Sequence, residues 1–220
     1  MIECREVSKT YQIGNTVTEA VRSICLKADA GEFVVILGHS GSGKSTLLSM
    51  IGGLTRPSAG QVAVGGEDIW QWSDNKRAQF RNRTIGFVFQ FASLIPTLTV
   101  LDNIALPSLF GEGMSSAARL RARELAGIVG LSDKIDSYPS EISGGQQRRV
   151  AISRAFLNDP KIVLADEPTG DLDEATEAQV MDVFTAMCRQ RKTTILMVTH
   201  NRDLIKSADR TLVMKDGAIL

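Results

Sequence analysis

Phe33-Val-Val-Ile-Leu37-Gly38-His-Ser-Gly-Ser-Gly43-Lys44-Ser45 is the most informative segment of this chain for its fold. Its first five residues are apolar, four of them β-branched or aromatic, and a glycine-rich turn follows them, which predicts a buried strand. The residues Ser45–Ile51 predict a helix that ends at the pair Gly52-Gly53. The order is therefore strand, glycine-rich loop and helix.

The loop Gly38–Ser45 fits the pattern G-x-x-x-x-G-K-[ST] without a mismatch. Glycines let successive N–H groups point at phosphate oxygens, and the helix after the loop adds its positive end. Lys44 is expected at the β and γ phosphates, and the hydroxyl of Ser45 at Mg²⁺. We interpret His39 as a tolerated position rather than a catalytic one. The predicted ATP-binding residues are Gly38, His39, Ser40, Gly41, Ser42, Gly43, Lys44, Ser45 and Thr46.

Short apolar runs alternate with helical patterns along the rest of the chain, which favours an α/β fold with a parallel sheet and helices on both faces. Helical character dominates from Leu94 to Leu157, where Leu125, Ile128 and Val129 are expected on one face and Ser143 is a good N-cap. The further expected strands are Gln61–Val64, Ile85–Phe89, Ile162–Ala165, Thr194–Thr199 and Arg210–Met214, and a helical core stripe is formed by Val180, Val183, Phe184 and Met187.

The apolar strand Ile162–Ala165 leads directly into the adjacent acids Asp166 and Glu167. A solvated strand end would explain such a pair taken alone. Together with a phosphate loop upstream, the better explanation is that Asp166 holds Mg²⁺ through water and Glu167 polarises the water that attacks the γ-phosphate.

Composition bounds the remaining possibilities. The 220 residues suffice for one α/β domain, and 25 basic against 25 acidic residues give no overall field that would attract nucleic acid. Cys4, Cys25 and Cys188 lack a CxxC pattern and are expected to be reduced thiols packed as small apolar groups. The uncharged stretch Thr84–Leu101 is too polar for a membrane span. We therefore expect a soluble chain that reaches a membrane only through a partner.

The segment Ile142-Ser143-Gly144-Gly145-Gln146, together with the loop and the acidic pair, resembles the ABC ATPases over essentially the whole chain. The signature of that family is LSGGQ, and isoleucine in place of leucine keeps its apolar character. Ser143 and the glycines open a helix with exposed N–H groups, which is a second anion site. The resemblance implies that two copies stack head to tail, so that Ser143, Gly144, Gly145 and Gln146 of one copy close the ATP site of the other.

Further positions match the family one by one. Tyr11 matches the aromatic residue that stacks on adenine, with an ordinary strand tyrosine as the alternative. Gln90 matches a glutamine that touches Mg²⁺ and senses the membrane partner. Asp173, in the segment Gly170–Asp173, matches a residue near the dimer seam, and a helix N-cap would explain it equally well. His200 matches the histidine that contacts the γ-phosphate. The implied catalytic residues are Glu167, His200 and Lys44, and the implied metal-binding residues are Ser45, Gln90 and Asp166.

Within this family, the chain is most similar to the ATPases of lipoprotein-releasing, macrolide-exporting and related mechanotransmission systems. The segments that carry this similarity are Gly86–Phe91, Pro96–Thr99 and Ala165–Asp173. Two departures stand out. Arg148-Arg149 replaces the usual Gln-Arg, which is expected to alter contacts at the subdomain surface but not the chemistry. The chain printed here also ends at Leu220, without the C-terminal extension of the family.

The resemblance implies a P-loop NTPase fold with a RecA-like core at residues 1–90 and 158–220, an N-terminal antiparallel β subdomain, and a helical subdomain at about 91–157. It implies ATP and Mg²⁺ as ligands, and a peripheral position on the cytoplasmic face of the inner membrane. The implied partners are a second copy, an integral membrane permease and a periplasmic adaptor, with no nucleic acid.

Other functions fit less well. Chromosome-maintenance ATPases need a long coiled-coil insertion, which this chain lacks, and translation-factor relatives carry two cassettes. A small-molecule kinase would not explain Ser143–Gln146 or His200. An ABC ATPase that transmits force to cell-wall or division enzymes, without moving a substrate, stays open as an alternative to export.

Overall fold

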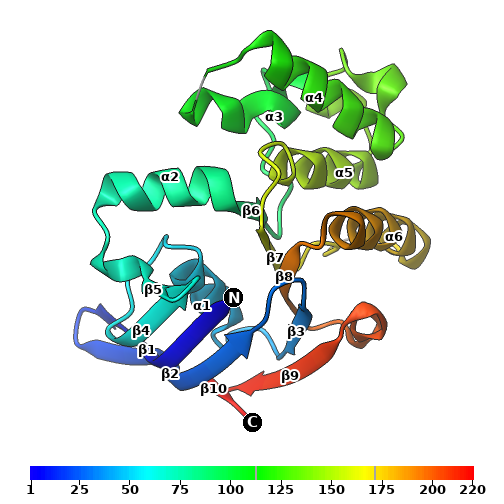
Figure 1. Cartoon of the computed structure of the whole chain (residues 1–220). Helices are drawn as coiled ribbons and strands as arrows, with labels where there is room; N and C mark the ends of the chain where they lie inside the picture. The colour runs from blue at the N-terminus through cyan, green and yellow to red at the C-terminus, as the bar shows by residue number, and fades with distance from the viewer. Residues whose placement is uncertain (112, 171) are drawn as a thin grey trace.

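The computed structural model describes residues 1–111, 113–170 and 172–220 and arranges them around two sheets (Figure 1). The larger sheet has the strand order β10-β9-β3-β8-β7-β6, and the smaller one β2-β1-β4-β5. The strands are β1 (Ile2–Ile13), β2 (Thr16–Ala28), β3 (Phe33–Leu37), β4 (Ala59–Val64), β5 (Glu67–Asp68), β6 (Ile85–Val88), β7 (Ile162–Asp166), β8 (Thr194–Thr199), β9 (Arg210–Lys215) and β10 (Ala218–Ile219).

Helices cover both faces of the larger sheet, as the sequence predicts. The α-helices are α1 (Lys44–Ile51), α2 (Asp74–Thr84), α3 (Val100–Ala105), α4 (Ser116–Ile128), α5 (Gly144–Ala155) and α6 (Glu174–Arg191). Short 3-10 helices lie at η1 (Ile69–Gln71), η2 (Leu106–Phe110), η3 (Ser132–Lys134), η4 (Pro139–Glu141) and η5 (Arg202–Ser207).

Strands β9, β3, β8, β7 and β6 run parallel, which confirms the predicted parallel sheet, while β10 pairs antiparallel with β9. The predicted strand Thr194–Thr199 is reproduced residue for residue. The predicted strand Ile85–Phe89 ends one residue earlier, at Val88, because the carbonyl of Phe89 accepts a hydrogen bond from Arg148 instead. All five parallel strands end at the same edge of the sheet.

Each central strand contributes alternate residues to two separate cores. In β3, Val34 and Ile36 face α1 and the smaller sheet, whereas Phe33 and Val35 face the helices α3 to α6. The same alternation runs through β7 and β8, because successive side chains of a strand point to opposite faces. The larger sheet thus separates one core behind the phosphate loop from another beneath the helices.

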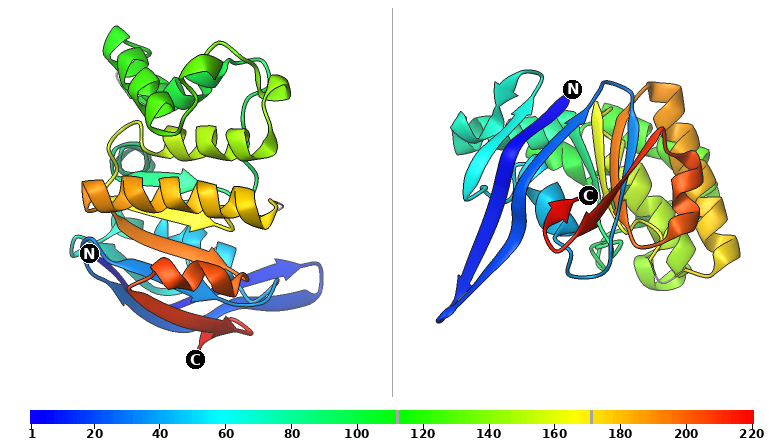
Figure 2. Two further views of the ribbon diagram at one scale, coloured as in Figure 1. Left: turned by 90° about the vertical axis from the view of Figure 1, so that its right-hand side faces the viewer. Right: turned by 90° about the horizontal axis from the view of Figure 1, so that it is seen from below.

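The smaller sheet is the predicted N-terminal antiparallel subdomain. Its β1–β2 hairpin extends away from the other elements (Figure 2, right). Positive φ angles at Glu6 and Ser23 accompany the register shifts between these two strands. Cys25 is exposed because its neighbours Ile24 and Leu26 point inward, so the prediction that all three cysteines pack as apolar groups is wrong for Cys25.

Cys4 and Cys188 are buried, as predicted. Burial raises the pKa of the Cys4 thiol to about 12 and also raises the pKa of Cys188. Both thiols therefore stay protonated at neutral pH and act as small apolar side chains.

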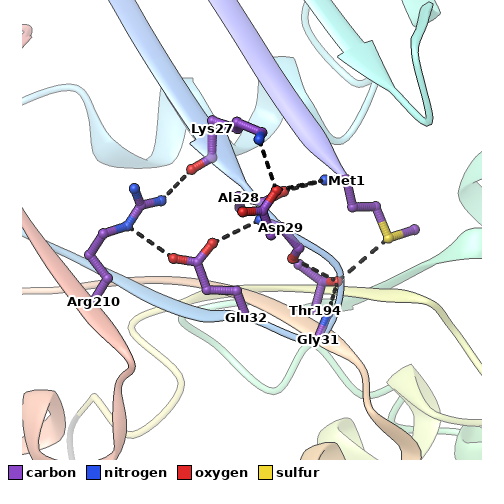
Figure 3. Close-up of polar contacts among 8 residues, drawn as sticks. All are labelled: Met1, Lys27, Ala28, Asp29, Gly31, Glu32, Thr194 and Arg210. Carbon is purple, nitrogen blue, oxygen red and sulfur yellow. Dashed lines mark hydrogen bonds and ion pairs between the residues drawn. The ribbon is translucent and has the colours of Figure 1, made fainter.

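Polar contacts fix the connection between β2 and β3 (Figure 3). The guanidinium of Arg210 lies 3.0 Å from a carboxylate oxygen of Glu32, whose other oxygen accepts the N–H of Asp29 at 2.8 Å. The hydroxyl of Thr194 accepts the N–H of Gly31 at 2.9 Å. These bonds join β8 and β9 to the start of β3, at the sheet edge opposite the phosphate loop.

Helices α3, α4 and α5 lie together above β6 and α6 (Figure 1). The core-facing stripe of α4 is Ala122, Leu125, Ala126 and Val129, at the spacing i, i+3, i+4, i+7. Ile128, predicted on the same face as Leu125 and Val129, falls beside this stripe and is exposed. The limits of the helical subdomain at residues 91 and 157 stay a prediction.

The core stripe predicted in the later helix is confirmed at three positions. Val180, Phe184 and Met187 of α6 are buried, and Val183 packs partly buried against the same core. Within the part of the chain that the structure describes, no helix combines the length and apolarity that crossing a membrane requires.

Candidate functional site

The strand register brings the predicted site residues to one edge. Leu37 pairs with Thr199, and Asp166 pairs with Val198, at the carboxyl ends of their parallel strands. The loops after β3, β7 and β8 therefore meet, and the loop after β6 lies beside them because Val88 pairs with Ala165. A crevice at the carboxyl ends of parallel strands is the usual ligand position in open α/β sheets.

A pocket of about 300 Å³ opens at this edge. It joins the phosphate loop to residues from three other loops that are distant in sequence. Its lining residues are Ala20, Ser40, Gly41, Gly43, Lys44, Ser45, Thr46, Gln90, Asp166, Glu167 and His200. The structure therefore brings together most of the predicted ATP-binding, metal-binding and catalytic residues.

The phosphate loop is closed by backbone contacts that leave no room for side chains at two glycines. A Cβ atom at Gly38 would lie 2.4 Å from the carbonyl oxygen of Met214. Gly43, the N-cap of α1, has a φ of 99°, and a Cβ there would lie 2.1 Å from the carbonyl oxygen of Ala20. These glycines are required by the close approach of strands β2 and β9 to the loop.

Gly43→Ala is expected to lower the free energy of unfolding by about 2 kcal/mol or more, because it adds a clash with backbone to the strain of a positive φ. Urea unfolding of the purified chain measures this effect. Gly41→Ala is the matched control, because Gly41 has a φ of 79° in the same loop but nothing within 4 Å of its Cβ position. Equal losses in the two variants would contradict the packing argument.

Lys44 folds over the loop that precedes it. Its ammonium group donates hydrogen bonds to the carbonyl oxygens of Gly38 at 2.7 Å and His39 at 2.9 Å. Burial lowers the pKa of Lys44, and the carboxylates of Glu167 and Asp166 oppose that shift. The side chain is buried, yet it lines the pocket, so its positive charge is held at the mouth of the loop.

Asp166 and Ser45 form an oxygen-rich corner of the pocket. The Ser45 hydroxyl lies beside the Asp166 carboxylate, and the Gln90 side chain lines the same pocket. Burial raises the pKa of Asp166 and Glu167 raises it further, while Ser45 and Lys44 lower it. Hydroxyl, carboxylate and amide oxygens are the ligands that Mg²⁺ prefers, so these residues fit that ion.

Glu167 is held by contacts on both carboxylate oxygens. One oxygen accepts the Thr199 hydroxyl at 2.9 Å, and the other lies 2.9 Å from Nδ1 of His200. The backbone of Glu167 has a φ of 44°, and its N–H donates to the carbonyl of Val198 at 2.9 Å. Neighbouring strands thus aim this carboxylate into the pocket.

Sequence reasoning missed Thr199. It is the last residue of the otherwise apolar strand end Ile195–Thr199 and is buried, so its hydroxyl requires a partner. The signal was the single hydroxyl at the end of that strand, directly before His200. The partner itself could not be read from the sequence, because Glu167 lies 32 residues away.

The segment Ser143–Gln146 does not line this pocket. Ser143 caps α5 as predicted: its hydroxyl accepts the N–H of Gln146 at 3.3 Å, and its own N–H donates to the Gln146 side chain at 2.8 Å. Gly144 and Gly145 form the first turn of the helix, and a Cβ at Gly145 would lie 2.4 Å from the Thr176 side chain. The helix start is therefore capped but lies outside the pocket formed by its own chain.

Tyr11 and Asp173 also lie away from the lining of the pocket. Tyr11 is partly exposed on β1, with the ammonium of Lys9 5.1 Å from its ring centre. Asp173 is the N-cap of α6, which confirms that interpretation: its carboxylate accepts the N–H and hydroxyl of Thr176, and these bonds lower the pKa of Asp173. Asp171, within the predicted segment Gly170–Asp173, lies outside the described residues.

Comparisons with known proteins agree with this geometry. Residues 21–170 match the family described as ABC transporter. Over the full chain, the protein is 43% identical to a lipoprotein-releasing system ATP-binding protein of Geobacter metallireducens, covering 98% of it. It is 44% identical to a macrolide export ATP-binding/permease protein of Chlorobium phaeobacteroides, and spans only 33% of that longer protein.

A solved ATP-binding cassette has the same fold. It was determined as a dimer in a post-hydrolysis state with ADP and Pi, and it superimposes with a TM-score of 0.89 at 37% identity, covering all of this chain and 96% of the cassette. The chain belongs to the ABC transporter family, as one of its ATP-binding and ATP-hydrolysing subunits. The roles of individual site residues stay predictions of the sequence and the geometry.

Proposed function

We propose that two copies of this chain bind ATP between them and drive a membrane permease that exports a substrate or releases lipoproteins. The observation that supports a dimer is that the two predicted anion sites lie apart in one copy. The helix start at Ser143 lies outside the pocket that is lined by the phosphate loop and by Gln90, Asp166, Glu167 and His200. In a head-to-tail pair, Ser143–Gln146 of one copy would cover the pocket of the other. The dimeric arrangement of the solved relative supports this assignment.

In this mechanism the loop amides and Lys44 stabilise the charge that develops on the β and γ oxygens of ATP, which is the main contribution to phosphoryl transfer. Ser45, Gln90 and Asp166 would hold Mg²⁺, which when bound neutralises phosphate charge. Glu167 orients and activates the attacking water. His200, within 2.9 Å of Glu167, would contact the γ-phosphate.

The proposed permease site is a groove of about 660 Å³ between α2, β6, η2 and α5. Phe89 and Phe110 line it and are exposed, and Phe89 precedes Gln90. Arg81 and Arg154 also line it. Exposed aromatic side chains beside cations suit a short apolar segment that carries a carboxylate. A partner seated there would lie next to the segment that leads to Gln90.

Phe110→Asp is expected to abolish binding of the membrane partner, because a charged carboxylate replaces an apolar contact in the groove. The side chain of Phe110 is already 77% exposed, so the substitution leaves the core intact. The tagged chain is recovered from detergent-solubilised membranes, and co-purified integral membrane proteins are identified by mass spectrometry. Leu120→Asp on α4 is the matched control, because Leu120 is 61% exposed and lies outside the groove. Equal recovery of the permease with both variants would contradict the docking site.

The nature of the recovered partner also tests export. A permease with a large extracytoplasmic domain and a periplasmic adaptor would support export, and export is the activity in the name of the macrolide export relative. A partner bound to a cell-wall hydrolase would instead support force transmission without transport. Both outcomes would support a peripheral position of the chain on the membrane.

A further inference from the structure

Arg148 is a buried cation that joins three parts of the site. It lies in α5, five residues after the N-cap Ser143, and is only 5% exposed. Its Nη1 donates to the carbonyl of Phe89 and its Nη2 to the carbonyl of Gly170, both at 2.9 Å. The expectation that Arg148 alters contacts only at the subdomain surface is therefore wrong.

Each of these carbonyls belongs to a segment that carries a proposed functional residue. Phe89 directly precedes Gln90. The N–H of Gly170 donates to the carbonyl of Glu167 at 3.1 Å, so the two residues close one turn. One planar guanidinium thus connects the signature helix α5 to the Gln90 segment and to the Glu167 turn.

A second arginine of the same helix holds the other end of the Gln90 segment. Arg154 donates to the carbonyls of Ala92 at 2.6 Å and Ser93 at 2.8 Å, and burial lowers its pKa. Backbone carbonyls on both sides of Gln90 are therefore bonded to α5. Separating the segment from the helix would break the bond that the buried Arg148 guanidinium donates to Phe89, and the loss of an acceptor by a buried charge is costly.

We propose that Arg148 is a positioning residue that makes α5, Gln90 and Glu167 move as one unit. When a partner copy or a permease displaces α5, the two hydrogen bonds of the Arg148 guanidinium displace the Gln90 segment and the Glu167 turn as well. The metal-binding Gln90 and the water-activating Glu167 therefore reach their working positions together. The proposal rests on the proposed function, because it assumes that Gln90 and Glu167 act in hydrolysis. It leaves nucleotide affinity to the phosphate loop, because the carbonyls of Phe89 and Gly170 that Arg148 binds belong to other segments.

The test uses Arg148→Lys, which keeps the charge but replaces the rigid two-pronged donor by a single point donor. The kcat for ATP hydrolysis is expected to fall about tenfold, while the KM for Mg-ATP changes less than about twofold, since only the transition-state arrangement is disturbed. In Arg148→Gln the side chain keeps a planar donor group, although with only one nitrogen. Its kcat is therefore expected to fall less than that of Arg148→Lys. Arg149→Lys is the matched control with an unchanged kcat, because Arg149 donates to the carbonyl of Val129 in the helical region.

Two further readouts separate this role from a purely structural one. Hydrogen exchange of the Gly170 amide, which donates to the carbonyl of Glu167, is expected to accelerate in Arg148→Lys and not in Arg149→Lys. A kcat within twofold of the parent in both Arg148 variants, or a loss confined to KM, would overturn the proposal. Glu167→Gln is measured in parallel: if it hydrolyses ATP normally, the proposed function fails, whereas a dead Glu167→Gln beside a fully active Arg148→Lys overturns only the inference on Arg148.

Discussion

Glu167→Gln is expected to keep ATP bound and to lower turnover by about 10²–10⁴-fold, the usual contribution of a general base. The amide is close in shape to the carboxylate, so the oxygen that accepts the Thr199 hydroxyl is retained. The charge that would activate water is lost. Without hydrolysis the closed pair of copies has no route to reopen, and the variant is expected to accumulate as a dimer.

Steady-state hydrolysis and light scattering after gel filtration with Mg-ATP measure the two effects. Glu124→Gln is the matched control, because Glu124 lies on α4 and pairs with Arg121 outside the pocket. A Glu167→Gln chain that stays monomeric at saturating Mg-ATP would refute the two-copy arrangement. Hydrolysis at the parent rate would refute the role of Glu167.

Lys44→Ala is expected to weaken ATP binding by at least about tenfold and to abolish measurable turnover, because a charge-assisted contact to phosphate contributes more than a neutral hydrogen bond. The carbonyl of Gly38 would lose the hydrogen bond that Lys44 donates, and the carbonyl of His39 would keep only the N–H of Ser42 at 3.2 Å. Calorimetric titration with ATP measures the affinity.

The fold of the Lys44→Ala chain is expected to survive, since the buried ammonium is itself disfavoured by desolvation. Thermal unfolding without nucleotide checks this point. Lys206→Ala serves as the control, because Lys206 is an exposed lysine paired with Asp203. Unchanged hydrolysis in Lys44→Ala would remove the basis for assigning Gly38–Ser45 as the phosphate loop.

The parts of the site that the sequence predicted share one property: each follows a strand at a fixed short distance. The loop after Leu37, the acids after Ala165 and His200 after Thr199 all lie at the sheet edge because the strands are parallel. The spacing within each motif is local, so one chain suffices to read it.

The parts that the sequence could not predict are contacts between distant segments. The Arg148 guanidinium reaches Phe89, 59 residues earlier, and Gly170, 22 residues later. The exposure of Cys25 and Ile128 depends on which face of an element meets its neighbour, and neither β2 nor α4 reveals its neighbour in its own pattern. Long-range packing decides these positions.

The larger sheet also divides the interior of the protein into two independently packed cores. Val34 and Val35 are adjacent in β3, yet the first packs with the helix behind the phosphate loop and the second with the helices that surround α5. A change of side-chain packing on one face of the sheet therefore leaves the side chains on the other face in place. The helices on one face of the sheet can thus be displaced while the core behind the phosphate loop keeps its packing. A single layer of strand backbone separates the two.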